Sequence, residues 1–354
     1  QPAAWGRKPV DSRPMSQVGA ENLRLGRRGP DHAPALRPGV CATARGGGGA
    51  GPMPMRHVFG DITNAAQAAP RLMKLAAPAA TKPFNAAFRG DEADVQSVAE
   101  YAADVHRNNF AEEAAFLPAP NYMEAQTEIN AKMRAILIDW LIEVHANYRF
   151  RSETLFLVVN IIDRFLSIRL VKRRKLQLVG VVAMFIASKF EEINPPSVAE
   201  FAHISDNTCT KAEILSLECV VLGALDFQIA TPTQAHFFER LARANGCDSQ
   251  HRFLAQYCME LGLLDIDTTR YAPSLLVSAA LLVSNQLLGR RPSWPASMVY
   301  HARHRDADPE MLVCARGLST ALEHAHESSL QAVRRKYQQE RCGAVANMSF
   351  KART

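Results

Sequence analysis

Charged side chains lie inside several strongly apolar stretches of this chain, and the chemistry they could perform is ion pairing and hydrogen bonding. Arg134 belongs to the segment 133–144, in which apolar residues recur with helical period on more than one side. Asp163 lies in a second such stretch, Lys189 ends a third and Glu218 lies within a fourth. A charge among apolar neighbours needs an oppositely charged partner or a route to water. These residues are therefore candidates for buried pairs or for charged anchors in an interface.

Nothing in the sequence indicates catalysis or metal binding. The 11 His are scattered, and His301 and His304 share a helical spacing of three without a further ligand nearby. The seven Cys form no Cys-x-x-Cys pair, which fits reduced thiols better than a disulfide framework or a zinc site. There is no Gly-rich loop before a helix and no nucleophile elbow. We therefore expect a protein that is not an enzyme and that uses neither a metal nor a cofactor.

Charge, Pro and Gly are unevenly distributed along the chain. Residues 1–95 contain 11 of the 20 Pro and 12 of the 19 Gly, with 13 Lys and Arg against 7 Asp and Glu. Such composition predicts that residues 1–94 form a disordered basic tail. Residues 96–354 carry 28 charges of each sign, and the longest apolar run, 178–187, is only ten residues long. We therefore expect neither nucleic acid nor a membrane as a partner of the folded part.

A series of predicted helices carries these charges. Apolar spacing predicts a lone amphipathic helix from about 94 to 105, a main helix near 127–149, a helix capped by Ser152 and a very apolar helix near 173–192. Ser197 and Thr210 are each followed three residues later by Glu, which predicts two capping boxes. Thr231 and Pro232 predict the start of a second series, near 232–245, 248–264, 273–288, 294–299 and 308–326. No segment alternates like a strand, so the predicted fold is all-α.

A faint internal repeat indicates two similar helical units. Residues 181–188 resemble residues 277–284, which lie 96 positions further on. This spacing fits two five-helix units in tandem, each built around a central helix rich in small residues. Lys189 then corresponds to Asn285, so the first unit has a charge that the second lacks.

Four segments together resemble the A- and B-type cyclins, the mitotic members of that family. They are 133–144, which begins Met-Arg-Ala-Ile-Leu, 161–166, 175–180 and 187–192. Residues 259–261 favour a G2/mitotic-specific B-type cyclin, whereas 293–295 and 335–337 are closer to the A type. The resemblance implies two tandem five-helix cyclin boxes, at 95–229 and 230–354, preceded by the tail.

The resemblance further implies a regulatory subunit that binds and activates a cyclin-dependent Ser/Thr kinase at the G2/M transition and in mitosis. Lys189 and Glu218 match the cyclin positions that hydrogen-bond the kinase backbone beside its regulatory helix. Composition alone would favour a solvated Lys and an ordinary exposed Glu. The apolar positions that match the same kinase-binding surface are Ile186, Phe190, Leu222, Phe227 and Ile229.

A second family site is a shallow groove that binds Arg-x-Leu peptides of substrates and inhibitors. The positions that match this groove are Met133, Ile136, Leu137, Trp140, Glu143, Leu176 and Gln177. The apolar residues would hold the Leu, and Glu143 would attract the cation. Most of such a stripe on a central helix belongs to the core. We therefore expect only Met133, Leu137 and Trp140 to be exposed.

Arg134 and Asp163 match a structural site of the family, a buried ion pair that joins the first two helices of the box. The alternative is two unrelated surface charges, which the apolar neighbours of both residues oppose. If the two are paired, removal of one partner leaves a buried charge and costs about 3–5 kcal/mol.

Within the tail, residues 56–64 resemble the destruction box of mitotic cyclins. Arg56 and Asn64 occupy its ends, and Phe59 replaces the usual Leu. An extended peptide with one cationic and one apolar anchor suits the groove of an adaptor protein. The resemblance thus implies a ubiquitin-ligase adaptor as a partner, removal by proteolysis, and a location in the nucleus and cytoplasm.

Other function classes are compatible with tandem cyclin folds. One is a nucleic-acid or transcription-factor module, which the neutral charge of residues 96–354 and the lack of an N-terminal zinc ribbon oppose. Another is a helical scaffold or a transcription-type cyclin without a cell-cycle role. An abundance that oscillates with the cell cycle would distinguish the mitotic interpretation from this second class.

Overall fold

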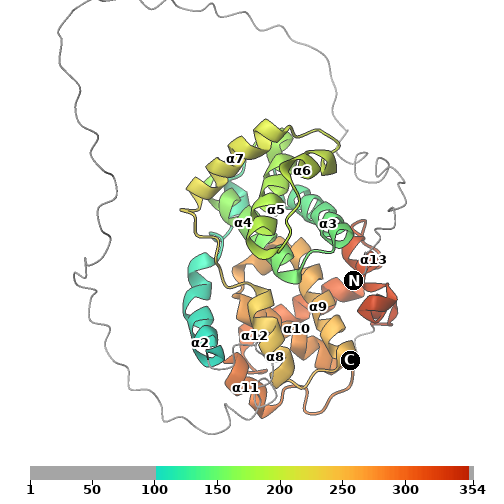
Figure 1. Ribbon diagram of the computed structural model, residues 1–354. Helices are drawn as coiled ribbons and strands as arrows, with labels where there is room; N and C mark the ends of the chain where they lie inside the picture. Colours follow the sequence, from blue (N-terminus) through green and yellow to red (C-terminus); the bar gives the residue numbers. More distant parts are fainter. Residues whose placement is uncertain (1–100, 351–354) are drawn as a thin grey trace, which may run out of the picture. The chain divides into compact units, whose positions relative to one another are not determined.

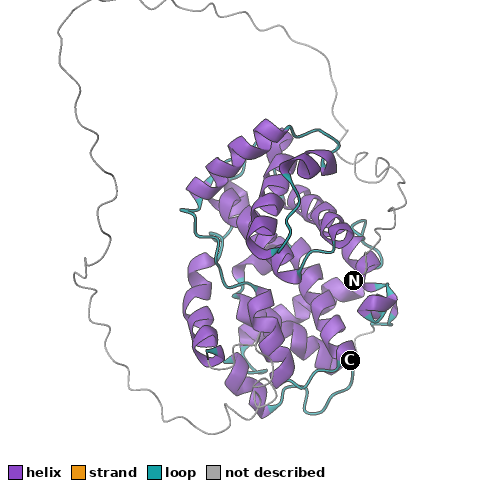
Figure 2. Ribbon diagram, viewed as in Figure 1, coloured by secondary structure: helices purple, strands orange, loops and turns teal. Residues whose placement is uncertain are grey.

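The computed structural model describes residues 101–350, and the regular elements in this range are all helical (Figures 1 and 2). The α-helices are α2 (Ala102–Glu112), α3 (Ala131–Tyr148), α4 (Ser152–Ile168), α5 (Leu176–Glu191), α6 (Val198–Ile204), α7 (Lys211–Ala224), α8 (Gln234–Ala244), α9 (Ser249–Leu264), α10 (Pro273–Leu287), α11 (Ala296–Ala302), α12 (Pro309–Glu323) and α13 (Ala332–Tyr337). The predicted all-α class is confirmed. The predicted tail, with the motif at 56–64, lies outside the described residues. No helix of the described range is long and apolar enough to cross a membrane.

Helix α5 is the centre of the first helical set, which comprises α3 to α7. All its residues from 178 to 188 are buried, and α3, α4, α6 and α7 pack around it. A Cβ atom on Gly180 would lie 2.7 Å from Cδ1 of Leu137, so glycine at this position lets the Leu137 side chain pack directly on α5. The close approach places one side of α3 firmly in the core.

Helix α10 has the same place in the second set, which comprises α8 to α12. Residues 273–285 are buried without interruption, and α8, α9 and α12 pack against the helix. The internal repeat thus corresponds to the two central helices. Their ends differ, because Asn285 donates from Nδ2 to Oδ1 of Asn245 at 3.0 Å and to the carbonyl of Ser293 at 2.8 Å. Near its C-terminal end α10 therefore carries a neutral amide that is hydrogen-bonded within the second set, whereas α5 carries Lys189 at the corresponding position.

Helix α2 precedes the first set in sequence but packs on α8 of the second set. The ring of Phe110 lies 5.0 Å from that of Phe237, and Nε2 of His106 donates to the carbonyl of His301 at 3.0 Å. Tyr101 and Val105 are apolar residues at helical spacing within the predicted segment 94–105, but both are exposed. The face of α2 that packs on α8 is instead formed by the half-buried Phe110 and the buried His106.

Helix α13 was not predicted, and it joins the two sets. It packs on α3 of the first set and on α9 of the second (Figure 1). The N–H of Ala332 donates to Oδ1 of Asp139 at 2.9 Å, and Nζ of Lys336 lies 2.5 Å from Oε1 of Glu260. With six residues, α13 is too short to give a periodic signal.

The predicted helices are present, but several boundaries differ: the helix expected to end near 105 continues to Glu112, and the main helix begins at Ala131 and not near 127. The capping boxes of Ser197 and Thr210 are both present. Ser152 is the first residue of α4 and not its N-cap, which is Arg151. The predicted start at Thr231 and Pro232 is wrong, because α8 begins at Gln234 after Thr233, whose Oγ1 lies 3.0 Å from Nδ1 of His236. Thr233 lies two residues after Thr231, and its contact with His236 places the helix start at this later position.

Candidate functional site

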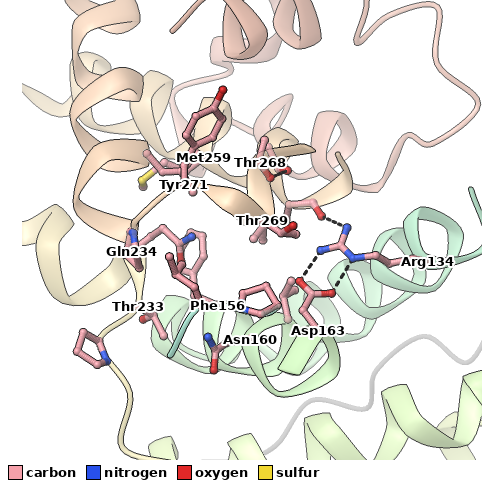
Figure 3. A pocket seen from close by; sticks show the side chains of 18 residues that line it. Arg134, Phe156, Asn160, Asp163, Thr233, Gln234, Met259, Thr268, Thr269 and Tyr271 are labelled. Carbon is pink, nitrogen blue, oxygen red and sulfur yellow. Dashed lines mark hydrogen bonds and ion pairs between the residues drawn. The ribbon is translucent and has the colours of Figure 1, made fainter. Parts of the chain in front are cut away.

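Arg134 and Asp163 form a buried bidentate ion pair between α3 and α4 (Figure 3). Nε and Nη2 of Arg134 donate to the two carboxylate oxygens at 2.7 and 2.6 Å. Nη1 donates at 2.9 Å to the carbonyl of Leu263 on α9, and the hydroxyl of Tyr122 donates to Asp163 at 2.7 Å. Burial alone would lower the pKa of Arg134, but the charge and hydrogen bonds of Asp163 outweigh it and raise this pKa. Arg134 therefore stays charged, and its contacts link both helical sets.

A small cavity lies beside this pair, between the two sets (Figure 3). Its volume is about 50 Å³, and its lining includes Phe156 and Asn160 of α4 together with Thr269 and Tyr271 that follow α9. This volume holds a few water molecules but no larger ligand. The buried pair and the cavity are therefore part of the structural joint between the sets.

Lys189 and Glu218 form a second ion pair, called here the charged pair, between the last turn of α5 and the middle of α7. The side chain of Lys189 is 42% exposed and that of Glu218 is 11% exposed. Nζ of Lys189 also lies 4.2 Å from the ring centre of Phe185. An ion pair with one partner this exposed contributes little to stability. Its two charges can therefore turn to another partner without loss of the fold.

Large apolar side chains are exposed around the charged pair. Phe190 follows the lysine directly, and Leu215 lies one turn before the glutamate on the same face of α7; both are exposed. Leu222, one turn after the glutamate, is half-buried. Ile186 and Ile229 are buried core residues. Their side chains are therefore not part of the exposed surface, and their role in kinase binding stays a prediction.

The turn after α7 presents a further aromatic side chain. Asp226 and Phe227 both have left-handed backbone, with φ of 50° and 57°, and Phe227 donates its N–H to the carbonyl of Leu222 at 2.9 Å. This conformation is uncommon for residues other than Gly, Asn and Asp, especially for bulky ones. Phe227 is nevertheless 70% exposed. The turn thus displays a large apolar group to solvent.

The groove positions on α3 and α5 divide into exposed and buried ones. Met133, Ile136, Trp140 and Gln177 are half-buried. Leu137 and Leu176 are buried, so the expectation that Leu137 is exposed is wrong. Its side chain packs against Gly180 of α5, and this contact between helices has no local signal in the sequence. The accessible part of this stripe is accordingly limited to the four half-buried residues and Glu143.

Glu143 already has a cationic partner in this chain, because it forms an ion pair with Arg335 of α13. One turn earlier on α3, Asp139 accepts the hydrogen bond of Ala332 at the start of α13. Burial raises the pKa of the Asp139 carboxyl, and the hydrogen bond and Arg335 oppose this rise. Sequence reasoning did not identify Arg335, since it lies 192 residues from its partner. The run of three cationic residues at 334–336 was the sequence feature that could have indicated a contact with a carboxylate.

The remaining candidates for chemistry have structural roles. His301 accepts through its carbonyl from His106, and Nε2 of His304 lies 3.1 Å from Oγ of the buried Ser274. Within residues 101–350 no group of three His, Cys, Asp or Glu could hold a metal ion. The cysteines of this range are free thiols.

The chain matches two family models, "Cyclin, N-terminal domain" over residues 104–230 and "Cyclin, C-terminal domain" over residues 232–351. It is 39% identical over 272 residues to Cyclin-B1-3 of Arabidopsis thaliana, which covers 77% of this chain and 64% of that protein. It is 40% identical over 258 residues to G2/mitotic-specific cyclin-A of Hydra viridissima, which covers 72% of this chain and 61% of that protein. A solved viral cyclin from herpesvirus saimiri has the same fold, with a TM-score of 0.56, 21% identity, and coverage of 61% of this chain and 96% of that chain.

These comparisons agree with the geometry. The two cyclin models meet between the first and second helical sets and together span most of the chain. The chain spans less than two thirds of the length of the curated relatives named above. A- and B-type relatives match at nearly the same identity. The chain therefore belongs to the cyclin family, among its mitotic A and B types.

Proposed function

We propose that this chain is the regulatory subunit of a cyclin-dependent Ser/Thr kinase that acts at the G2/M transition and in mitosis. The observation that supports this most directly is the charged pair, which is partly exposed and lies beside the exposed Phe190 and Leu215. Charged anchors within an apolar field are typical of large specific protein interfaces. The mitotic names of the relatives support the timing.

The chain would act by binding and not by catalysis. A protein kinase is active only when the Lys–Glu ion pair of its αC helix and its opened activation loop are both in place. A rigid helical protein that binds this arrangement more tightly than the inactive one shifts the kinase population toward it. Lys189 would donate to kinase carbonyls and Glu218 would accept from kinase N–H groups, in exchange for their mutual pairing. ATP and Mg²⁺ belong to the kinase.

The double variant Lys189→Ala, Glu218→Ala tests this proposal. We expect it to retain its thermal unfolding midpoint within a few degrees, because the pair is partly exposed. We expect activation of a mitotic cyclin-dependent kinase by the purified variant to be lost. The measurement is phosphate transfer to a histone-type substrate, with binding of the kinase followed in parallel.

Lys175→Ala is the matched control for the lysine. Lys175 precedes α5, pairs with Glu213 of α7, and is 46% exposed, much as Lys189 is. The control variant should activate the kinase like the unaltered protein. Full activation by the Lys189→Ala, Glu218→Ala variant would contradict the proposal.

We also propose that the half-buried stripe of Met133, Ile136, Trp140 and Gln177 recruits Arg-x-Leu-type substrates or inhibitors, with Glu143 attracting the cation. Apolar side chains beside a carboxylate support this proposal. Trp140→Ala should weaken binding of such a peptide at least ten-fold while kinase activation on a substrate without the motif is retained. Unchanged peptide binding by this variant would argue against the groove.

The proposal for the tail rests on sequence alone. We propose that residues 56–64 bind a ubiquitin-ligase adaptor, that the chain is removed by ubiquitin-dependent proteolysis after mitotic onset, and that it resides in nucleus and cytoplasm. Replacement of Arg56 and Asn64 by Ala should keep the abundance of a fluorescently tagged chain constant through mitotic exit. The same images report its location. An abundance that never oscillates in the unaltered protein would contradict this part.

A further inference from the structure

The position of Glu143 on α3 lets its side chain face either of two neighbours. Trp140 lies three residues before it and Asp139 lies four residues before it, so both share the surface of α3 with it. Trp140 belongs to the half-buried groove stripe, and Asp139 belongs to the flank that α13 covers. The carboxylate of Glu143 therefore stands at the border between the groove and α13.

Arg335 holds this carboxylate from the α13 side. Its side chain is 50% exposed and that of Glu143 is 29% exposed, so the pair remains in contact with water. The helix that carries Arg335 is fixed independently, by the Ala332–Asp139 hydrogen bond at one end and by the Lys336 and Tyr337 contacts with Glu260 at the other. A cation fixed in this way acts at a high effective concentration on its partner.

We propose that Arg335 is a specificity-determining residue of the docking groove, because it competes within the molecule for the carboxylate that would bind the peptide's cation. This inference rests on the proposed function of the groove. The groove then selects its peptides mainly by their apolar residue. It discriminates weakly between Arg-x-Leu peptides and peptides with a neutral residue in place of the Arg.

The exposure of the pair sets the size of the effect. Removal of the Arg335 side chain frees Glu143 from a surface ion pair. Such pairs are weak, so the affinity for the Arg-x-Leu peptide should change by about two- to five-fold. The same exposure makes the effect sensitive to salt, and it should shrink above roughly 0.3 M because surface charges are then screened.

The experiment uses the full chain and two fluorescent peptides that differ only in Arg or Ala at the cationic position. Affinities are measured by fluorescence anisotropy at low salt for the unaltered chain and for Arg335→Gln, Glu143→Gln and the double variant. We expect Arg335→Gln to bind the Arg peptide about two- to five-fold more tightly and the Ala peptide unchanged. In the Glu143→Gln background, Arg335→Gln should have no effect on either peptide.

Arg334→Gln is the matched control. Arg334 is the preceding residue of α13, and its guanidinium contact is with Gln331, in its own segment. This variant should leave both affinities unchanged, and thermal unfolding of each variant verifies that α13 remains folded. The inference is overturned if Arg335→Gln leaves the Arg peptide's affinity unchanged or raises both affinities equally. If neither peptide binds any form of the chain, the docking groove itself is rejected, and the inference with it.

Discussion

Arg134 uses three of its guanidinium nitrogens inside the protein, two for Asp163 and one for the carbonyl of Leu263. Both charged partners are nearly inaccessible to solvent. Replacement of Arg134 by Ala would leave the buried Asp163 carboxylate with the Tyr122 hydroxyl as its one remaining partner among residues 101–350. We expect the free energy of unfolding to fall by about 3–5 kcal/mol, measured by urea denaturation.

The control for this residue is Arg107→Ala. Arg107 pairs with Asp104 on the surface of α2, where both side chains are well exposed. Its loss should change the free energy of unfolding by no more than about 1 kcal/mol. Equal unfolding midpoints for the Arg134→Ala variant and the unaltered chain would show that the buried pair is not needed for stability.

At the scale of the element, we expect α13 to contribute to the stability of the fold, which a loosely attached terminal helix would not do. Glu260 of α9 is buried and accepts from both Lys336 and Tyr337, at 2.5 and 2.8 Å. Lys336→Ala removes the only cation that pairs with this carboxylate in the described chain, and should lower the free energy of unfolding by about 2–4 kcal/mol. Tyr337→Phe removes one hydrogen bond and should cost about 1 kcal/mol. Hydrogen exchange would then report faster opening of α13 in the first variant, and equal rates in both would contradict this ranking.

The long helices could be predicted because their signals are local. The periodicity of α3 and α5 and the capping boxes of Ser197 and Thr210 depend only on neighbouring residues. Helix α13 has six residues and forms where Asp139 and Glu260 hold it, so its existence depends on residues far away in the chain. Tertiary contacts, and not intrinsic propensity, decide such short helices.

The residues of the candidate site were harder to predict from the sequence than the helices that carry them. Lys189 and Glu218 were singled out by the family resemblance, since composition alone favoured two solvated charges. The exposure predicted for Leu137 is wrong because Leu137 packs against Gly180, 43 residues later in the chain. Nothing in the sequence of α3 itself indicates this contact. The contact of Arg335 with Glu143 likewise follows only from the packing of α13 on α3.

At the scale of the whole molecule, buried histidines make stability depend on pH. Burial lowers the pKa of His145 from 6.5 to about 4, and the nearby charge of Lys336 lowers it further. Burial, partly offset by the hydrogen bond to His301, likewise lowers the pKa of His106 to about 4. Glu113 and Asp139 act in the opposite sense, because burial raises the pKa of each carboxyl. The measured profile is the sum of these opposing contributions, so one histidine must be isolated by substitution.

His145→Gln isolates one contribution, since a Gln side chain can also donate to the Arg151 carbonyl that Nε2 of His145 contacts at 2.9 Å. At pH 5 the unfolded chain protonates His145 and the folded chain does not, because the folded pKa is about 4 and the unfolded pKa is 6.5. The stability that the neutral histidine contributes is therefore complete above pH 7 and is lost as pH falls toward 4. Between pH 7 and pH 5 the unaltered chain should lose about 2 kcal/mol more than the variant does, as measured by urea denaturation at each pH. Parallel pH profiles for the two proteins would mean that His145 becomes charged within the folded chain.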